Sequence, residues 1–166
     1  EPIIPPEAAR IMSLRDGSAK MSKSSSGDKG VIWMMDDAAA TAKKIRSAVT
    51  DTQAEVRYDP ETKPGVSNLL VMHSVLSGTR IEELERRFVG QGYGALKQEV
   101  ADVAVEAIRP FQTRMQELLD DPAELDRMLA LGAERAREVA VATMSRVRAA
   151  VGLLPSRVMA EPSARR

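Results

Sequence analysis

The chain has 166 residues, enough to bury one substantial core, and its 24 Lys and Arg residues balance 24 Asp and Glu residues. This balance excludes a global basic field, so any contact with nucleic acid must come from local clusters of positive charge. The absence of cysteine and the single histidine, His73, exclude a disulfide framework and zinc sites built from thiolates or several histidines. No apolar run approaches the ~18 residues of a membrane span and no signal peptide opens the chain, so we expect a cytoplasmic location without a membrane partner.

The first predicted element is a buried strand over residues 10–14, in which Ile11 and Leu14 are the apolar anchors. A single strand is not stable alone, so we expect it to add to a sheet, with residues 31–34 as a second, weaker extended segment. The pair Asp16-Gly17 predicts a turn directly after the strand.

The next feature is the pentapeptide Lys20-Met21-Ser22-Lys23-Ser24, which opens a polar loop rich in Gly and Ser. An ammonium group grips phosphate oxygens as a point charge, so Lys20 and Lys23 are suited to stabilising charge that develops on a leaving polyphosphate. Most Lys- and Ser-rich loops are only solvated surface. This pentapeptide, however, would occur by chance in about one in ten thousand chains of this length, which favours a functional loop.

The first predicted helix covers residues 38–49, because Asp36 and Asp37 can cap its N-terminus and match its dipole. Its second half concentrates positive charge, which is common in a solvated last turn. The positions that we expect to face the core are Ala38, Ala42, Ile45 and Val49.

A loop leads from this helix to a second one over residues 65–78, for which Ser67 or Asn68 is the predicted N-cap. Gly78 closes the second helix, since glycine readily adopts the left-handed conformation of a helix end. A short third helix is predicted over residues 81–89.

A long helix is predicted over residues 94–119, with a kink or break near residues 108–109 because of Pro110. Asp121 is the N-cap of the next helix, which Gly132 separates from a last one that ends near residue 151. The apolar stripes of these helices are interpreted as core. The stripe of the long helix consists of Leu96, Val100, Val103, Ala107, Phe111, Met115 and Leu118.

The pentapeptide is identical to the signature of class I aminoacyl-tRNA synthetases, in which it is the mobile loop that closes on ATP. A second block resembles one branch of this class, the bacterial tryptophanyl-tRNA synthetases, and is not shared with the tyrosine branch. The resemblance extends over about residues 3–153. The second block comprises Ala48-Val49-Thr50-Asp51, Val56-Arg57-Tyr58-Asp59 and Gly65-Val66-Ser67-Asn68-Leu69-Leu70.

This resemblance implies a mainly α fold, in which the end of a Rossmann-like nucleotide-binding domain (a strand plus the KMSKS loop) is followed by an α-helical bundle. The implied parts are a catalytic-domain remnant over 1–35, a helical anticodon-binding domain over 36–153 and a flexible tail over 154–166. The His-x-Gly-His signature with which class I enzymes hold ATP is missing. We therefore expect the C-terminal half of a longer enzyme, inactive alone, with the tryptophan pocket and the dimer interface mostly in the other half.

The resemblance implies ATP-dependent activation of L-tryptophan and its transfer to tRNA(Trp) by a homodimeric enzyme. Lys20 and Lys23 would be catalytic, acting on the triphosphate together with Mg²⁺, and no protein-bound metal site is expected in this chain. The residues that the resemblance places on ATP are Ile11, Lys20, Met21, Ser22, Lys23 and Ser24. The basic residues that we expect to contact tRNA are Lys43, Lys44, Arg46 and Arg57.

Two other functions stay open at this point: a non-catalytic helical RNA-binding module with a vestigial loop, and a purely structural helical bundle. ATP–pyrophosphate exchange separates the RNA-binding module from the enzyme, and a tRNA titration against salt separates both from the structural bundle. His73 is expected to be a packing residue, because the sequence offers no partner for a proton relay.

Overall fold

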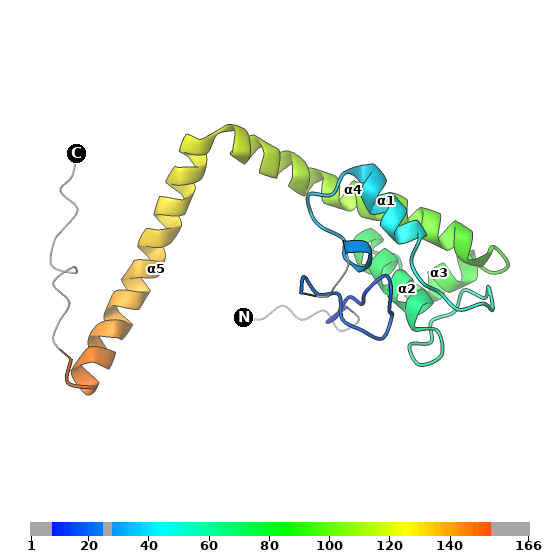
Figure 1. The fold of residues 1–166 in the computed structure, drawn as a ribbon, viewed down its shortest axis with the longest axis horizontal. Helices are drawn as coiled ribbons and strands as arrows, with labels where there is room; N and C mark the ends of the chain where they lie inside the picture. Colours follow the sequence, from blue (N-terminus) through cyan, green and yellow to red (C-terminus); the bar gives the residue numbers. More distant parts are fainter. Residues whose placement is uncertain (1–7, 25–27, 154–166) are drawn as a thin grey trace. The chain divides into compact units, whose positions relative to one another are not determined.

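The computed structural model describes residues 8–24 and 28–153, and this part of the chain is mainly helical, which confirms the predicted fold class. The chain divides into two compact units, Glu1–Arg114 and Met115–Arg166. The flexible tail predicted over 154–166 lies outside the described residues. The elements are a 3-10 turn, η1 (Asp28–Gly30), and the helices α1 (Ala38–Arg46), α2 (Pro64–Ser77), α3 (Ile81–Arg87), α4 (Gly92–Asp120) and α5 (Pro122–Ala150) (Figure 1).

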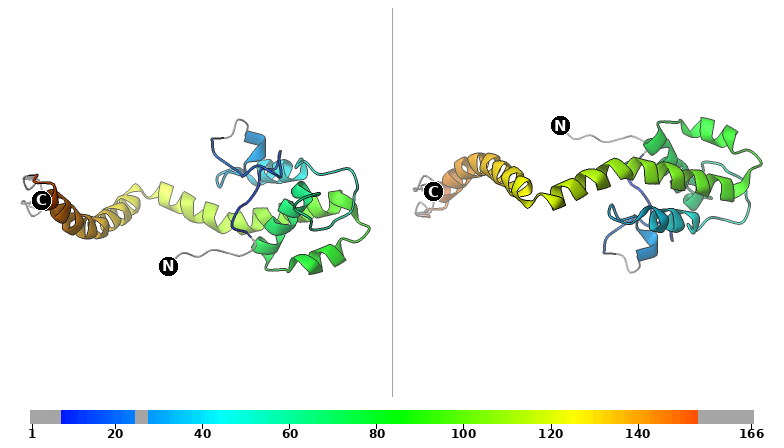
Figure 2. Two further views of the ribbon diagram at one scale, coloured as in Figure 1. Left: turned by 90° about the horizontal axis from the view of Figure 1, so that it is seen from below. Right: turned by 90° about the horizontal axis from the view of Figure 1, so that it is seen from above.

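The core of the first unit lies where α1, α2, α3 and the first part of α4 meet. Helices α1, α3 and α4 each turn a stripe of buried residues inward, whereas α2 is buried on all its faces from Val66 to Ser74. Figure 2 shows α1 on one side of the first part of α4 and α3 on the other. Leu14, which precedes the polar loop, is buried in the same core and so anchors that loop to the helices. The fully buried side chains that the helices supply include Ile45, Leu69, Leu70, Leu84, Leu96 and Val100.

The strand predicted over residues 10–14 is wrong in extent. Within the described residues it is reduced to an isolated antiparallel bridge between Met12 and Lys20, and residues 31–34 form no strand. A ladder needs a further strand alongside, and Met12 instead turns its other side toward Asn68 of α2.

Helix α1 begins as predicted but ends earlier. The Asp37 side chain caps its N-terminus and accepts a hydrogen bond from the N–H three residues on (2.6 Å). The helix ends at Arg46, because Ser47 is its C-cap and donates its hydroxyl to a carbonyl of the last turn. Val49 and Ala38 are exposed, contrary to their predicted place on the core face.

Helix α2 begins earlier than predicted, at Pro64, with Lys63 at the N-cap position. Proline suits the first helical position, since its ring fixes φ and it lacks the N–H that would be unsatisfied there. Ser67 and Asn68, the predicted N-caps, lie inside the helix and hydrogen-bond to neighbouring segments. Gly78 ends the helix as predicted, with a φ of 73°.

Helix α4 runs through Pro110 without interruption, so of the kink or break predicted near residues 108–109 the break does not occur. A proline inside a helix removes one backbone hydrogen bond, and the other bonds of this 29-residue helix keep it continuous. The buried stripe of α4 is also shorter than predicted, because Phe111 is 65% exposed and Met115 is exposed as well.

Helix α5 starts at the predicted N-cap, where Asp121 accepts a hydrogen bond from the Glu124 N–H (3.0 Å). It continues through Gly132, so the predicted separation into two helices is wrong; a single glycine costs a helix only about 1 kcal/mol. Within the described part of the chain no residue of α5 is buried, although we predicted its apolar stripe to be core. None of the described helices is both long and apolar enough to cross a bilayer.

Candidate functional site

The polar loop departs from two short antiparallel segments. The Ser13 N–H donates to the Ala19 carbonyl (2.8 Å), and the Met21 N–H donates to the Ile11 carbonyl (3.0 Å). These two bonds lie on either side of Lys20 along the chain. The backbone of Lys20 is therefore fixed, while its side chain is exposed.

The turn that joins the two segments forms at Asp16-Gly17, as predicted. The Asp16 carboxylate accepts hydrogen bonds from the Ser18 N–H (2.9 Å) and the Ser18 hydroxyl (2.6 Å). The hydroxyl bond and then the amide bond favour the ionised carboxylate and hold the pKa of Asp16 below its ordinary value. An ionised aspartate thus stabilises the turn directly before the loop.

A cavity of about 460 Å³ lies beside the loop. It brings together all the residues predicted to contact ATP except Ser24, which does not line it. A cavity with cationic, hydroxyl and apolar groups has the composition of a small-molecule site. The predicted residues that line it are Ile11, Lys20, Met21, Ser22 and Lys23.

Sequence reasoning missed the rest of this cavity's lining. Residues 31–34 also line it, and among them Trp33 and Met34 are exposed apolar side chains. The signal in the sequence was an apolar run, with the chain's single tryptophan, directly after a polar loop. Together, the ammonium groups and the apolar residues suit a ligand that has an anionic part and a flat apolar part.

The two lysines are available to a ligand. Within the described residues neither Lys20 nor Lys23 has a hydrogen-bond or ion-pair partner, and both are exposed. Ser22 lies between the two lysines in the chain and Ser24 directly follows Lys23. The hydroxyl oxygens of these two serines are 3.4 Å apart. Unpaired ammonium groups on a loop can neutralise phosphate oxygens without first breaking an internal ion pair.

The chain that follows the loop is held on the helices. The Leu14 N–H donates to the Gly30 carbonyl (3.1 Å), at the end of η1. The Gln112 side chain of α4 donates to the carbonyls of Met34 and Asp36, both at 2.8 Å. The loop is therefore anchored to the helical core on both its sides.

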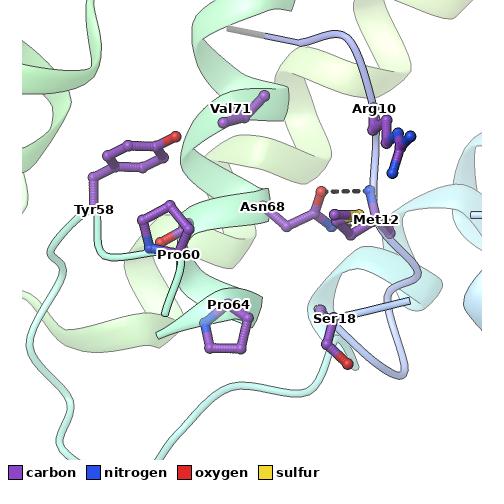
Figure 3. A pocket seen from close by; sticks show the side chains of 10 residues that line it. Arg10, Met12, Ser18, Tyr58, Pro60, Pro64, Asn68 and Val71 are labelled. Atoms are coloured by element: carbon purple, nitrogen blue, oxygen red, sulfur yellow. Dashed lines mark hydrogen bonds between the residues drawn. The ribbon is translucent and has the colours of Figure 1, made fainter. Parts of the chain in front are cut away.

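A second cavity, of about 350 Å³, lies at the N-terminal part of α2 (Figure 3). Asn68 and Met12 form one side of it, and Figure 3 shows the hydrogen bond between them. Tyr58 and Pro60 come from the preceding loop, and Arg10 from the segment before the KMSKS loop. Residues of the second sequence block thus pack against the segment that directly precedes the KMSKS loop.

The four basic residues predicted to contact tRNA lie in different environments. Lys43 and Arg57 are exposed, and Arg46 is exposed with its guanidinium 3.4 Å from the Gln98 amide oxygen. Lys44 is 8% exposed, and its ammonium lies 2.7 Å from the Asp36 carboxylate. The structure therefore leaves three of these cations on the surface and buries the fourth in an ion pair.

A partly buried polar cluster joins the loop before α2 to α4. The Tyr93 hydroxyl donates to Asp51 Oδ1 (2.6 Å), and the Lys63 ammonium donates to the same oxygen (3.3 Å). Burial raises the pKa of Asp51, but the hydrogen bonds from Tyr93, the Gln53 N–H and Lys63 outweigh it and hold the pKa below its ordinary value. Asp51 is thus an ionised anchor of the fold.

The other two members of this cluster respond in the opposite direction. Burial lowers the pKa of Lys63, but its bonds with Tyr93 and Asp51 outweigh burial and raise the pKa above its ordinary value. Burial and then the bond to Asp51 raise the pKa of Tyr93. Near neutral pH the cluster therefore holds a carboxylate, an ammonium and a neutral phenol.

His73 is buried and satisfied, as predicted. Its Nδ1 lies 3.1 Å from the Ser77 hydroxyl and its Nε2 lies 3.0 Å from the Glu99 carboxylate, which also pairs with Arg87. This network ties α2 to α3 and α4. In the described part of the chain no group of three or more His, Cys, Asp or Glu side chains could hold a metal ion.

Comparison with known proteins gives the same family from sequence and from structure. A family model described as tRNA synthetases class I (W and Y) matches residues 1–109. The tryptophan–tRNA ligase 2 of Streptomyces avermitilis is 53% identical over 157 residues, which are 95% of this chain and 47% of that protein. The tryptophan–tRNA ligase of Mycobacterium leprae is 51% identical over 93% of this chain and 45% of its own length.

Solved structures agree. The tryptophanyl-tRNA synthetase of Mycoplasma pneumoniae has a TM-score of 0.79 at 28% identity, over 90% of this chain and 47% of that one. The enzyme of Campylobacter jejuni, solved with ADP and tryptophan, has a TM-score of 0.64 at 28% identity, over 90% of this chain and 45% of that one. The chain spans about half the length of the curated relatives it matches.

The family predicted from the two sequence blocks is therefore confirmed, since the family model covers most of the chain. The relatives with the highest identities given above are named for tryptophan. The chain belongs to the class I tRNA synthetases of the tryptophan and tyrosine branch.

Proposed function

We propose that this chain supplies the polyphosphate-binding loop and the tRNA-binding helices for ATP-dependent activation of L-tryptophan and its transfer to tRNA(Trp). The observation that best supports the proposal is that Ile11, Lys20, Met21, Ser22 and Lys23 all line one cavity. The names of the relatives support tryptophan as the amino acid and a tRNA as the acceptor.

In the first step a tryptophan carboxylate oxygen would attack the α-phosphorus of ATP. The bond from that phosphorus to the bridging oxygen breaks, which gives tryptophanyl-adenylate and releases pyrophosphate. Negative charge grows on the departing pyrophosphate, and the ammonium groups of Lys20 and Lys23 would stabilise it. Magnesium that arrives with ATP would share this charge.

The remaining lining of the cavity would position the nucleotide. The carbonyl of Ile11 accepts a hydrogen bond from the Met21 N–H, so the segment that would lie beside the adenine ring is joined directly to the loop that would lie beside the phosphates. The apolar side chains of Trp33 and Met34 would cover the nucleotide from the far end of the loop. Ser22 would offer its hydroxyl to the phosphates, and Ser24, outside the cavity lining, would complete the loop.

The helical part would recognise tRNA. We propose that residues 1–35 serve the catalytic domain and residues 36–153 the recognition of the anticodon. Of the predicted contacts, Lys43, Arg46 and Arg57 are exposed cations able to reach phosphates. Lys44 would contribute to tRNA binding only indirectly, because its ion pair with Asp36 fixes the start of α1.

Tryptophan-dependent ATP–pyrophosphate exchange by the full-length gene product tests the proposal. We expect exchange with tryptophan and no exchange with tyrosine. Binding of tRNA(Trp) without any exchange would favour the non-catalytic RNA-binding module instead. We also propose that the full-length product is a homodimer and acts in the cytoplasm. Sedimentation of the full-length product measures its oligomeric state.

A further inference from the structure

Asn68 makes a contact that its helix does not require. It lies in the second turn of α2, is 5% exposed, and directs its side-chain amide at the backbone of Met12 (Figure 3). Its Oδ1 accepts from the Met12 N–H at 2.9 Å, and its Nδ2 donates to the Met12 carbonyl at 2.9 Å. One side chain thus satisfies both backbone groups of one residue.

This pairing takes the place of a neighbouring strand. In antiparallel segments successive residues direct their backbone groups to opposite sides. Ile11 and Ser13 bond to the segment that contains Lys20, so the backbone groups of Met12 point the other way, toward α2. The amide of Asn68 offers both a donor and an acceptor, as a peptide unit does.

A second contact holds the same two pieces together. A Cβ added to Gly17 would lie 2.5 Å from the Gly65 nitrogen and 2.6 Å from the Pro64 carbonyl carbon. Only glycine permits this approach of the turn before the loop to the first turn of α2. Gly65 is itself confined, since its added Cβ would lie 2.2 Å from the Val49 carbonyl oxygen.

We propose that Asn68 is a positioning residue for the lysine loop: by holding Met12 it fixes the paired backbone of Lys20 and so places that ammonium on the polyphosphate. The inference rests on the proposed function and gives Asn68, one residue of the second sequence block, a task in catalysis. It predicts that Asn68 acts through Lys20 and not through ligand contact.

The matched control is Ser67. It directly precedes Asn68 in α2, is also buried, and accepts a hydrogen bond from the Asp59 N–H (2.9 Å). Ser67→Ala therefore also removes a buried hydrogen bond to a backbone N–H, but at a different loop from the one that contains Met12. A general loss of stability would affect both variants, whereas loss of positioning would affect only Asn68→Ala.

The experiment measures tryptophan-dependent exchange at saturating ATP for the full-length product, with four variants. These are Asn68→Ala, Ser67→Ala, Lys20→Ala and the double variant Asn68→Ala/Lys20→Ala. We expect Asn68→Ala to lower kcat at least about tenfold, since small misplacements of catalytic groups have such effects. Ser67→Ala should stay within about twofold of wild type, and adding Asn68→Ala to Lys20→Ala should change its kcat by less than about twofold.

A readout independent of activity accompanies the kinetics. Amide hydrogen exchange of Met12 and Met21 should be faster in Asn68→Ala than in wild type and unchanged in Ser67→Ala. Should Asn68→Ala not fold, Asn68→Asp carries the same test, because it keeps the acceptor for the Met12 N–H and removes the donor to the carbonyl.

The outcomes separate the inference from the proposed function. An inactive wild type would refute the proposed function, while the amide exchange would still report on the Asn68–Met12 contact. If the wild type is active, either of two results would refute the inference. One is that Asn68→Ala has the same kcat as Ser67→Ala, and the other is that Asn68→Ala lowers kcat as much in the Lys20→Ala background as in the wild type.

Discussion

The Lys44 ammonium lies 2.7 Å from the Asp36 carboxylate, with both side chains largely buried. Asp36 also accepts a hydrogen bond from the Trp33 N–H (3.1 Å), in the segment that lines the loop cavity. One ion pair therefore joins helix α1 to the chain that leaves the loop. Among the described residues, Lys44 has a structural partner that its exposed neighbour Lys43 lacks.

Replacing Lys44 by Ala should lower the free energy of unfolding by about 1–3 kcal/mol, because the Asp36 carboxylate would keep a partly buried charge without its partner. Lys43→Ala is the matched control and should change stability by no more than about 0.5 kcal/mol. Urea denaturation of both variants measures the difference. Equal stabilities of the two variants would mean that the Lys44–Asp36 ion pair contributes nothing measurable to the free energy of unfolding.

The exposed cations should act on tRNA. Replacing Lys43, Arg46 and Arg57 together by Ala should weaken tRNA(Trp) binding and reduce the slope of log K against log salt by about one for each phosphate that is no longer neutralised. Tryptophan-dependent pyrophosphate exchange should hardly change. The measurement is a filter-binding titration at several salt concentrations. An unchanged slope would mean that these residues are ordinary solvated surface and do not contact phosphates.

The loop lysines should act in the transition state. Lys20→Ala or Lys23→Ala in the full-length product should each raise the barrier to activation by about 2–4 kcal/mol, seen in kcat more than in KM for ATP. Arg at either position should rescue only in part, since a planar guanidinium does not reproduce an ammonium point charge. Variants with intact kcat and a raised KM for ATP would show that the lysines only tether the ground state.

The 166-residue chain by itself should make no adenylate. It lacks the His-x-Gly-His signature and corresponds to about half the length of its relatives. We expect no tryptophan-dependent pyrophosphate exchange from the purified chain, with the full-length product as the positive control. Measurable exchange by the chain alone would contradict this expectation.

The cluster of Asp51, Lys63 and Tyr93 should make stability depend on pH at both ends of the scale. The folded pKa of Asp51 is lowered, so its contribution is present above its ordinary pKa of 3.8 and is lost as the pH falls through the folded value. The folded pKa values of Lys63 and Tyr93 are raised, so their contributions are present below 10.5 and 10.0 and are lost at higher pH.

Tyr93→Phe should test this cluster. It removes the hydrogen bond to Asp51 and should cost about 1–3 kcal/mol at neutral pH. The difference from wild type should begin to shrink below pH 3.8, where the unfolded carboxylate takes up its proton, and should continue to shrink as the pH falls through the lowered folded pKa. Denaturation of both proteins from pH 3 to 11 measures it, and a difference independent of pH would assign the loss to packing.

Much of the fold follows from local sequence. Asp37 and Asp121 cap helices as predicted, because a side-chain oxygen directly before an apolar periodic run can accept a hydrogen bond from a free N–H of the first turn. The predicted separation at Gly132 fails and Pro110 does not break its helix, since each is a local penalty that a 29-residue helix outweighs. Helix interruption depends on the sum over the helix and not on one residue.

The site could be predicted only where a motif is contiguous. The pentapeptide led to Lys20 and Lys23, and the structure places them in one cavity with Ile11. The contacts of Asn68 with Met12 and of Gln112 with Met34 join residues far apart in the chain, and no spacing rule reports them. The burial of Lys44 was also not predicted: Asp36 is close in the chain, but the ion pair depends on how the segment before α1 folds back along that helix.

The antiparallel pairing beside the loop makes its two lysines thermodynamically unlike. Lys20 lies within the pairing, so the conformational entropy of its backbone is already lost when the protein folds. Lys23 lies beyond the last of these hydrogen bonds, and fixing a backbone residue costs about 1–2 kcal/mol. Two identical side chains would then meet the same phosphates with different entropies of association, and the temperature dependence of ligand affinity in Lys20 and Lys23 variants would differ accordingly.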